Sequence, residues 1–270
     1  MKFFSESNIQ KMKINFHKYQ GTGNDFIMID NRLSWFPLDN VALINAMCDR
    51  RFGIGADGLI LLENDPEHDF KMTYYNSDGN QSTMCGNGGR CIVQFAHDLG
   101  VIENETTFSA IDGLHHAKII ENEVSLQMID VEKIDLNQDG SVFLNTGSPH
   151  HVQIVDDVVA FPIYDFGKKV RYSEQYAPGG TNVNVVEKTD NGFKMRTYER
   201  GVENETLSCG TGATAVAIAM YHLKETNNTS IPLLVSGGKL TVSFEEKNSC
   251  FYNIYLKGAA QFVFQGIWNQ

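Results

Sequence analysis

Two short segments combine a cysteine with glycines in the same pattern: Cys85-Gly86-Asn87-Gly88 and Cys209-Gly210-Thr211-Gly212. A cysteine at the start of a helix lies beside backbone N–H groups that have no partner within the helix, and these groups favour negative charge. The glycines allow the carboxylate of a ligand to approach the same N–H groups. Each segment therefore predicts a thiol with a lowered pKa beside a site for an anion.

The presence of two such segments predicts a reaction that needs two acid/base groups of one kind. A single free cysteine is more often a small buried apolar residue, but a pair at equivalent positions favours a function. Inversion of a stereocentre removes a proton from one face and returns one to the other, so one thiolate acts as base and one thiol as acid. The helix starts would stabilise the charge that spreads onto the reacting carboxylate. Nothing in the sequence indicates a metal or pyridoxal phosphate, so we expect no cofactor.

The chain contains an internal repeat in which four pairs of similar segments occur in the same order. The pairs are 21–30 with 147–156, 58–63 with 182–187, 70–75 with 193–198, and 85–88 with 209–212. Because the spacing within the pairs is nearly constant, the pattern indicates a duplicated α/β unit. A twofold relation between the halves would bring Cys85 and Cys209 face to face across a cleft.

Strands and helices must position the two cysteines. Residues 70–76 and 193–200 are short, rich in aromatic and β-branched residues, and bounded by turn residues, which predicts strands. Apolar residues recur at helical spacing from Cys91 until Gly100, and residues 213–220 are apolar on nearly every face, which predicts a helix buried among strands. We predict the α/β (α+β) class: two pseudo-symmetric halves, each a mixed, mostly antiparallel sheet around a central helix.

The repeat also suggests domain limits. We expect an N-terminal half over residues 1–130, of which residues 1–11 form an extension outside the fold, and a C-terminal half over residues 131–261. The strand-like run near 262–270 is expected to join the first half.

Composition excludes several classes of protein. The 270 residues carry a formal charge of −11, which argues against unaided binding to nucleic acid. No apolar run approaches the length of a membrane span. The five cysteines form no Cys-x-x-Cys pair, which favours a reduced, cytoplasmic protein rather than a disulfide scaffold.

Several segments resemble the motifs of the diaminopimelate epimerase family. They are 21–26, 51–58, 76–79 with 85–90, 180–183, 198–201 and 209–212. The resemblance covers the chain from Ile14 onward and implies the fold of that family. It further implies a cofactor-independent, two-base epimerase that interconverts L,L- and meso-diaminopimelate, a precursor of lysine and peptidoglycan, and that forms a homodimer.

The resemblance also implies roles for individual residues. It makes Cys85 and Cys209 the acid/base pair, with His150 and Glu199 adjusting their pKa. The substrate contacts that it implies are Asn24, Asn76, Gly86, Asn87, Asn182, Glu199, Arg200, Gly210 and Thr211. An arginine fork suits a carboxylate, and Asn or Glu can accept from an ammonium group. The sequence departs from the family at Gly58, where some members have a substrate-contacting Gln, and at Ser148, where many have Asn.

Other functions remain open at this point. A second two-cysteine racemase of the same fold, of histidine or proline type, is the nearest alternative. A hydrolase or transferase with one cysteine nucleophile would need a positioned His and leaves the second cysteine segment unexplained. A module that only binds a carboxylate would need neither thiol. A dinucleotide site at residues 53–58 is rejected because a strand-like run, not a helix, follows it.

Overall fold

The computed structural model describes residues 13–269, so the extension predicted for residues 1–11 lies outside the described residues. The first part of the chain forms β1 (Lys13–Gly21), β2 (Asn24–Asp30), α1 (Val41–Cys48), β3 (Gly58–Glu63), β4 (Phe70–Asn76), β5 (Gln81–Ser82), α2 (Gly86–Asp98), β6 (Glu105–Ala110), β7 (Gly113–Ile120) and β8 (Glu123–Gln127). The second part forms β9 (Ile134–Leu136), β10 (Val142–Asn145), β11 (Pro149–Ile154), α3 (Ile163–Arg171), a 3₁₀ turn (Glu174–Tyr176), β12 (Asn182–Thr189), β13 (Gly192–Glu199), β14 (Asn204–Thr206), α4 (Gly210–His222), β15 (Ser230–Val235), β16 (Gly238–Lys247), β17 (Cys250–Gly258) and β18 (Gln261–Asn269).

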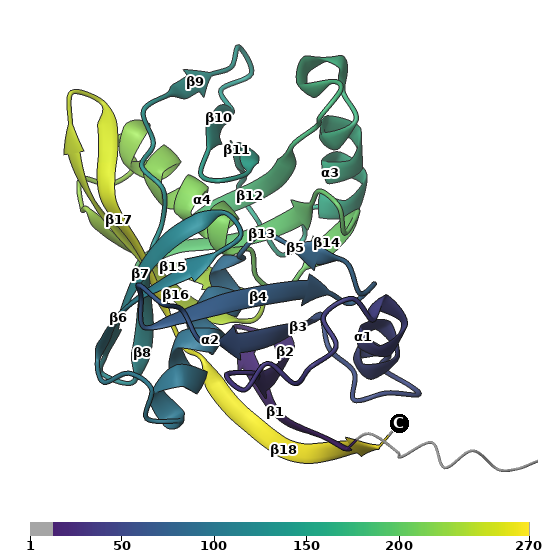
Figure 1. Ribbon diagram of the computed structural model, residues 1–270. Helices are drawn as coiled ribbons and strands as arrows, with labels where there is room; N and C mark the ends of the chain where they lie inside the picture. Colours follow the sequence, from purple (N-terminus) through teal and green to yellow (C-terminus); the bar gives the residue numbers. More distant parts are fainter. Residues whose placement is uncertain (1–12, 270) are drawn as a thin grey trace, which may run out of the picture.

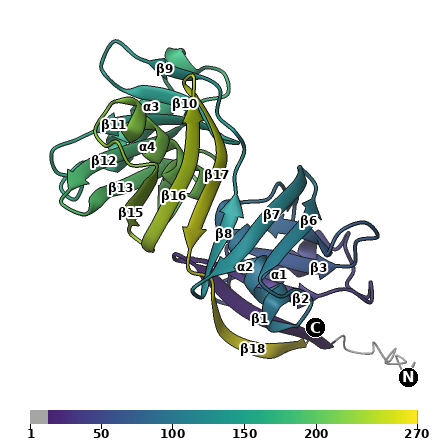
Figure 2. The same cartoon turned by 90° about the vertical axis from the view of Figure 1, so that its left-hand side faces the viewer.

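The two parts form two lobes with the same order of elements (Figures 1 and 2). In the first lobe the strands pair in the order β18, β1, β2, β3, β4, β6, β7, β8, and in the second in the order β9, β10, β11, β12, β13, β15, β16, β17. Among the strands of the described residues, the parallel pairs are β2–β3 and β4–β6 in the first lobe and the matching β11–β12 and β13–β15 in the second. The predicted mixed, mostly antiparallel architecture is confirmed.

Strands β8 and β17 connect the two lobes. β8 pairs antiparallel with β17, so that Leu126 lies opposite Leu256. Both leucines belong to one apolar cluster that also contains Phe95 of α2 and Val216 of α4. The two lobes therefore share a core, and their burial of apolar surface stabilises them together.

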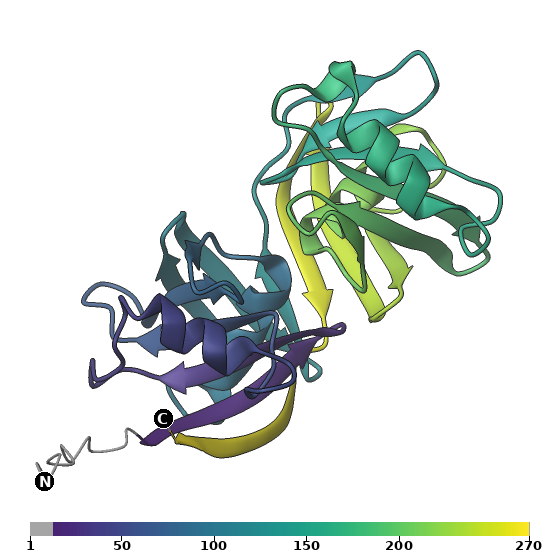
Figure 3. The ribbon, with the colours of Figure 1, turned by 90° about the vertical axis from the view of Figure 1, so that its right-hand side faces the viewer.

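Helix α2 contacts β1, β2, β3, β7, β8 and β18, and α4 contacts β10 to β13 and β15 to β17, so each helix lies inside the curled sheet of its lobe. Helices α1 and α3 lie on the outer faces of the two lobes (Figure 3). In α4 every residue from Gly212 to Met220 is buried. Small side chains such as Ala213, Ala215 and Ala217 allow strands to approach the helix from several sides. The prediction of a helix buried among strands is confirmed. None of the helices in the described part of the chain is long and apolar enough to cross a membrane.

The last strand returns to the first lobe. β18 pairs antiparallel with β1, from Lys13 opposite Asn269 to Gln20 opposite Gln261. In Figure 1 it runs along the lower edge of the molecule, beneath β1. The sheet of the first lobe is thus completed by β18, which follows the second lobe in the sequence.

Candidate active site

A cavity of about 740 Å³ lies where the N-termini of α2 and α4 meet. Each helix begins directly after its cysteine, and Gly86 contacts Gly210 at the floor. The structure places most of the sequence-predicted residues on the cavity wall: Asn24, Asn76, Cys85, Gly86, Asn87, Glu199, Arg200, Cys209, Gly210 and Thr211. Residues from both lobes therefore line one space.

Cys85 is the N-cap of α2, and its Sγ accepts a hydrogen bond from the Gly88 N–H at 3.2 Å. Burial raises the pKa of the Cys85 thiol to about 11, with the Gly88 N–H and the charge of Arg90 acting in the opposite direction. Burial also raises the pKa of the Cys209 thiol, and the Glu199 carboxylate adds to this effect. The prediction of a lowered thiol pKa from the helix starts is therefore wrong, because desolvation outweighs the N–H groups.

Behind Cys209, a chain of hydrogen bonds extends into the protein. The Asn184 Nδ2 donates to the His151 carbonyl at 3.0 Å and to His150 Nδ1 at 3.1 Å. Because His150 Nδ1 accepts, its Nε2 carries the proton and donates to Thr211 Oγ1 at 2.9 Å. Thr211 Oγ1 lies 3.5 Å from Cys209 Sγ. Burial lowers the pKa of His150 to about 3, so the imidazole is neutral.

Glu199 ends strand β13 at the edge of the cavity. Its Oε2 accepts from the Thr206 hydroxyl of β14 at 2.9 Å. Burial raises the pKa of the Glu199 carboxyl despite this hydrogen bond. A half-buried carboxylate in this position can accept hydrogen bonds from an ammonium group.

Asparagine side chains connect the two lobes beside the thiols. Asn87 Nδ2 donates to Asn24 Oδ1 and, at 3.1 Å, to the Ser208 carbonyl. Asn24 Nδ2 in turn donates to Asp57 Oδ2 at 2.9 Å. Since Ser208 precedes Cys209, this network fixes the start of one helix relative to the residue before the other thiol.

Two sequence-predicted residues, His150 and Asn182, lie outside the cavity wall. Asn182 is buried, and its Nδ2 donates to Ser148 Oγ at 2.9 Å and to the Pro149 carbonyl at 3.0 Å. Its Oδ1 accepts from the Arg200 backbone N–H at 2.8 Å. Asn182 therefore supports Ser148 and Arg200, which do line the cavity.

The cavity is also lined by four residues that the sequence did not mark individually as site residues: Asp57, Tyr74, Thr206 and Ser208. Tyr74 accounts for one departure from the family: a Cβ added at Gly58 would lie 2.5 Å from its Cε2 atom. The glycine thus leaves room for the Tyr74 ring. The alternation of β4 could have placed Tyr74 on the same face as Asn76, whereas nothing in the sequence marks Thr206 or Ser208.

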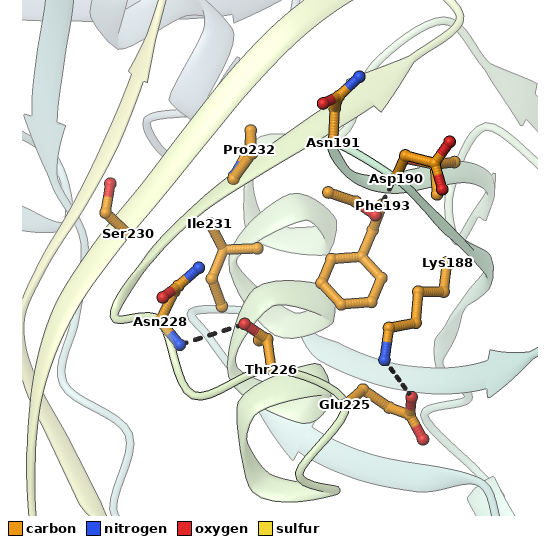
Figure 4. A pocket seen from close by; sticks show the side chains of 12 residues that line it. Lys188, Asp190, Asn191, Phe193, Glu225, Thr226, Asn228, Ser230, Ile231 and Pro232 are labelled. Carbon is orange, nitrogen blue, oxygen red and sulfur yellow. Dashed lines mark hydrogen bonds and ion pairs between the residues drawn. The ribbon is translucent and has the colours of Figure 1, made fainter.

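A second hollow, of about 330 Å³, lies at the far end of the second lobe (Figure 4). The β12–β13 turn and the segment after α4 line it, and Lys188 pairs there with Glu225 at 3.1 Å. It contains none of the residues that the sequence predicts for chemistry. Within residues 13–269, no three His, Cys, Asp or Glu side chains gather as a metal site would require.

Solved structures share the fold. A Bacillus anthracis protein described as a phenazine biosynthesis protein of the PhzF family superposes with a TM-score of 0.77 at 13% identity, covering 95% of this chain and 99% of that chain. A hydroxyproline epimerase from Agrobacterium vitis superposes with a TM-score of 0.66 at 14% identity, covering 95% and 92%. At these identities the likeness concerns the fold alone.

Sequence comparison is more specific. A diaminopimelate epimerase from Flavobacterium psychrophilum is 64% identical over 251 residues, which cover 92% of this chain and 98% of the relative. One from Aquifex aeolicus is 40% identical over 273 residues, covering 94% and 97%. The family model described as diaminopimelate epimerase matches twice, at residues 16–134 and 142–263. The chain therefore belongs to the diaminopimelate epimerase family.

Proposed function

We propose that Cys85 and Cys209 are the acid/base pair that inverts the α-carbon of diaminopimelate. The reaction of this family is diaminopimelate epimerisation, a step of lysine and peptidoglycan precursor synthesis. The observation that carries the residue assignment is that both cysteines cap helices whose N-termini meet at one cavity. A substrate carbon between them is reached by one thiol from each face.

Epimerisation would take place by two proton transfers, one to a cysteine and one from the other cysteine. The thiolate of one cysteine takes the α-hydrogen as a proton, and the electron pair of the C–H bond delocalises onto the carboxylate. The thiol of the other cysteine then gives its proton to the opposite face of the carbon. The two cysteines exchange their protonation states in each turnover, so the reverse reaction uses the same pair with the roles exchanged.

The helix starts would hold the reacting carboxylate. Gly86-Asn87 and Gly210-Thr211 line the cavity in the first turns of α2 and α4, so their backbone N–H groups would stabilise the negative charge that develops on the carboxylate. Glu199 would accept from an ammonium group of the substrate, and Arg200 with Asn76 and Asn24 would bind its polar groups. Asn182 would act indirectly, by holding Ser148 and the Arg200 backbone in position.

His150 would act on Cys209 through Thr211. Its protonated Nε2 satisfies the Thr211 oxygen, so the Thr211 hydroxyl is free to donate to Cys209 Sγ. A hydrogen bond to a thiolate favours the charged form. The neutral imidazole would therefore help Cys209 to serve as base without exchanging a proton itself.

The test is to incubate the reduced protein with L,L-diaminopimelate in deuterated water without added cofactor. We expect deuterium at the α-carbon and formation of the meso isomer. Proline and histidine serve as comparison substrates, because the related two-cysteine racemases would exchange their α-hydrogens. No exchange into diaminopimelate by folded, reduced protein would refute the assignment.

We further propose that the protein acts in the cytoplasm as a homodimer that pairs through β18. Within residues 13–269, β18 pairs only with β1, which leaves its other edge unpaired. Its side chains Phe262, Val263, Phe264 and Ile267 are exposed and apolar. An exposed apolar edge favours addition of another strand, and two copies of β18 can pair antiparallel about a twofold axis.

Light scattering coupled to size exclusion would test the dimer. We expect twice the mass of one chain for the wild type and a monomer for Val263→Lys, because a charge on the edge opposes strand pairing. Lys118→Ala, on exposed β7, is the control and should remain dimeric. A wild-type monomer at micromolar concentration would contradict this part of the proposal.

A further inference from the structure

Arg90 is a fully buried cation in the second turn of α2. Its side chain is 0% exposed. Nη1 donates to the Gly86 carbonyl at 3.2 Å, and Nη2 donates to Thr22 Oγ1 and Asn87 Oδ1 at 3.0 Å. All three acceptors are neutral, and Nε has no hydrogen-bond partner in the part of the chain that the structure describes. Within residues 13–269 no carboxylate forms an ion pair with Arg90.

A buried charge without a counter-charge is costly, and such groups persist where they act on another charge. Cys85 and the reacting carboxylate are the negative groups that the proposed reaction places beside α2. The Gly86 carbonyl that Arg90 contacts belongs to the peptide whose N–H is on Asn87. The Asn87 N–H is among the groups that favour the charged form of Cys85, so polarisation of this peptide by Arg90 would stabilise the Cys85 thiolate further.

The second lobe provides an internal comparison. Position 214 follows Cys209 by the same interval at which Arg90 follows Cys85, and it holds a threonine. Thr214 Oγ1 donates to the Gly210 carbonyl at 3.1 Å, and Thr214 is 0% exposed. In each helix, the fifth residue after the cysteine thus donates to the carbonyl of the glycine that follows the cysteine. The donor is a guanidinium in α2 and a hydroxyl in α4. At this position of the two helices, the halves of the site differ by one positive charge.

We propose that Arg90 is an electrostatic positioning residue that biases the single negative charge of the thiol pair toward Cys85, whereas Thr214 leaves Cys209 without such a charge. This inference rests on the proposed function of the two thiols. It predicts that, before turnover, Cys85 is the thiolate and acts as the base, whereas Cys209 is the thiol and acts as the acid.

The other charged and titratable groups around the thiols act on them differently from Arg90. The Glu199 carboxylate opposes ionisation of both thiols. Tyr74 and Asp57 line the same cavity, and neither carries positive charge. Arg200 also lines the cavity, but it is partly exposed, so solvent screens its charge more than that of the buried Arg90.

Thr211, held by His150, acts in the opposite direction to Arg90, because its hydroxyl can donate to Cys209 Sγ. Arg90 also favours the charged form of its neighbour Cys91, but burial raises the pKa of that thiol, which does not line the cavity. Of the two thiols that line the cavity, Cys85 alone has Arg90 among the groups that favour its charged form.

Alkylation by iodoacetamide tests the proposal without turnover, because the thiolate is the reactive form. The reduced full-length chain is treated between pH 6 and pH 9, and the peptides that contain Cys85 and Cys209 are quantified by mass spectrometry. We expect the rate for Cys85 to begin rising at lower pH than the rate for Cys209. The opposite order in the wild type would overturn the proposal.

Two substitutions at position 90 separate charge from packing. Arg90→Met removes the charge and should lower the ratio of Cys85 to Cys209 alkylation about tenfold at pH 8, equivalent to about one pKa unit. Arg90→Lys keeps the charge and should keep the ratio within about twofold. Thr214→Val removes the matched neutral donor and should leave Cys85 unchanged. A folded Arg90→Met protein with the wild-type ratio would refute the proposal.

Since Arg90 is buried, circular dichroism must first establish that each variant folds. If Arg90→Met does not fold, the wild-type pH profile and the Arg90→Lys variant still test the role of Arg90. Equal pH dependence of alkylation at Cys85 and Cys209 in the wild type would refute the proposal. The readout is independent of the substrate. The predicted alkylation order without diaminopimelate exchange would therefore refute the proposed function alone.

Discussion

Gly86 and Gly210 pack against each other at the point where α2 and α4 begin. A Cβ added to Gly86 would lie 3.4 Å from the Gly210 Cα, and a Cβ added to Gly210 would lie 3.2 Å from the Gly86 Cα. Either Cβ would also approach Cδ2 of Leu256. The distance between the helix starts, and so between the two thiols, depends on the absence of side chains at these positions.

We expect Gly210→Ala to lower the rate of epimerisation at least tenfold, because the added methyl group pushes α4 away from α2 and from Leu256. Overpacking of this kind should also lower the free energy of unfolding by about 1–3 kcal/mol. Initial rates of deuterium exchange and urea unfolding measure the two effects. Gly179→Ala, where no heavy atom lies within 4 Å of the added Cβ, is the control and should behave as wild type. Unchanged rates in Gly210→Ala would contradict the close contact.

Replacement of either Cys85 or Cys209 by Ala should lower epimerisation by about 10²–10⁴ and leave substrate binding intact, because acid/base groups contribute about this factor to rates. The double variant should lose little more than either single variant, since the thiols act as a unit. Rates come from isomer analysis and binding from calorimetry. Cys250→Ala, on β17, controls for the loss of a thiol elsewhere. Full activity in either active-site variant would exclude the two-base mechanism.

Glu199→Gln should have opposite effects on thiol reactivity and on catalysis. Removal of the carboxylate charge lowers the pKa of both thiols, so alkylation at pH 8 should become faster. Epimerisation should become slower, because the acceptor for the ammonium group is weakened. Because the pKa of Glu199 is higher in the folded than in the unfolded protein, the folded protein loses stability as the pH rises and this carboxyl group ionises. The variant lacks this loss, so urea unfolding at pH 8 should show it to be more stable than wild type. Glu174→Gln, on an exposed 3₁₀ turn, should change none of these properties.

Acid should destabilise the protein through two buried imidazoles. Burial lowers the pKa of His150 to about 3 and that of His151 to about 4. Histidines of the unfolded chain titrate near pH 6.5. The unfolded state therefore binds protons that the folded state does not, and this contribution to stability is complete above about pH 6.5 and declines as the pH falls.

The expected slope is about 1.4 kcal/mol per pH unit for each histidine between about pH 6 and pH 4.5. Urea unfolding of the wild type and of His151→Asn across this range measures it, and the difference between the two proteins isolates one residue. Parallel curves for the two proteins would show that His151 does not contribute.

The sequence predicted the elements that depend on local pattern and on repetition. Residues 70–76 form β4 as expected, and α4 is buried because an all-round apolar helix has no solvent face. The two cysteine segments meet at one cavity because the halves repeat the same order of strands around their helices. Such features follow from the spacing of apolar residues along the chain and from the internal duplication.

Features that depend on three-dimensional surroundings were not predictable in this way. The thiol pKa was expected to be low because a helix start can be recognised from sequence, whereas the burial that raises it cannot. Asn182 has both ends of its amide engaged by Ser148 and Arg200, which only the packing of β11 against β12 reveals. Likewise, the contribution of Ser208 comes from contacts with residues of the other lobe.

The pairing of β18 with β1 has a consequence for the order of folding during synthesis. The ribosome produces β18 after all other strands of both lobes, although β18 belongs beside the first strand. While the second lobe is being made, the outer edge of β1 therefore remains unpaired, an arrangement that favours association with other chains. The risk of such association ends only when translation reaches β18 and this strand pairs with β1.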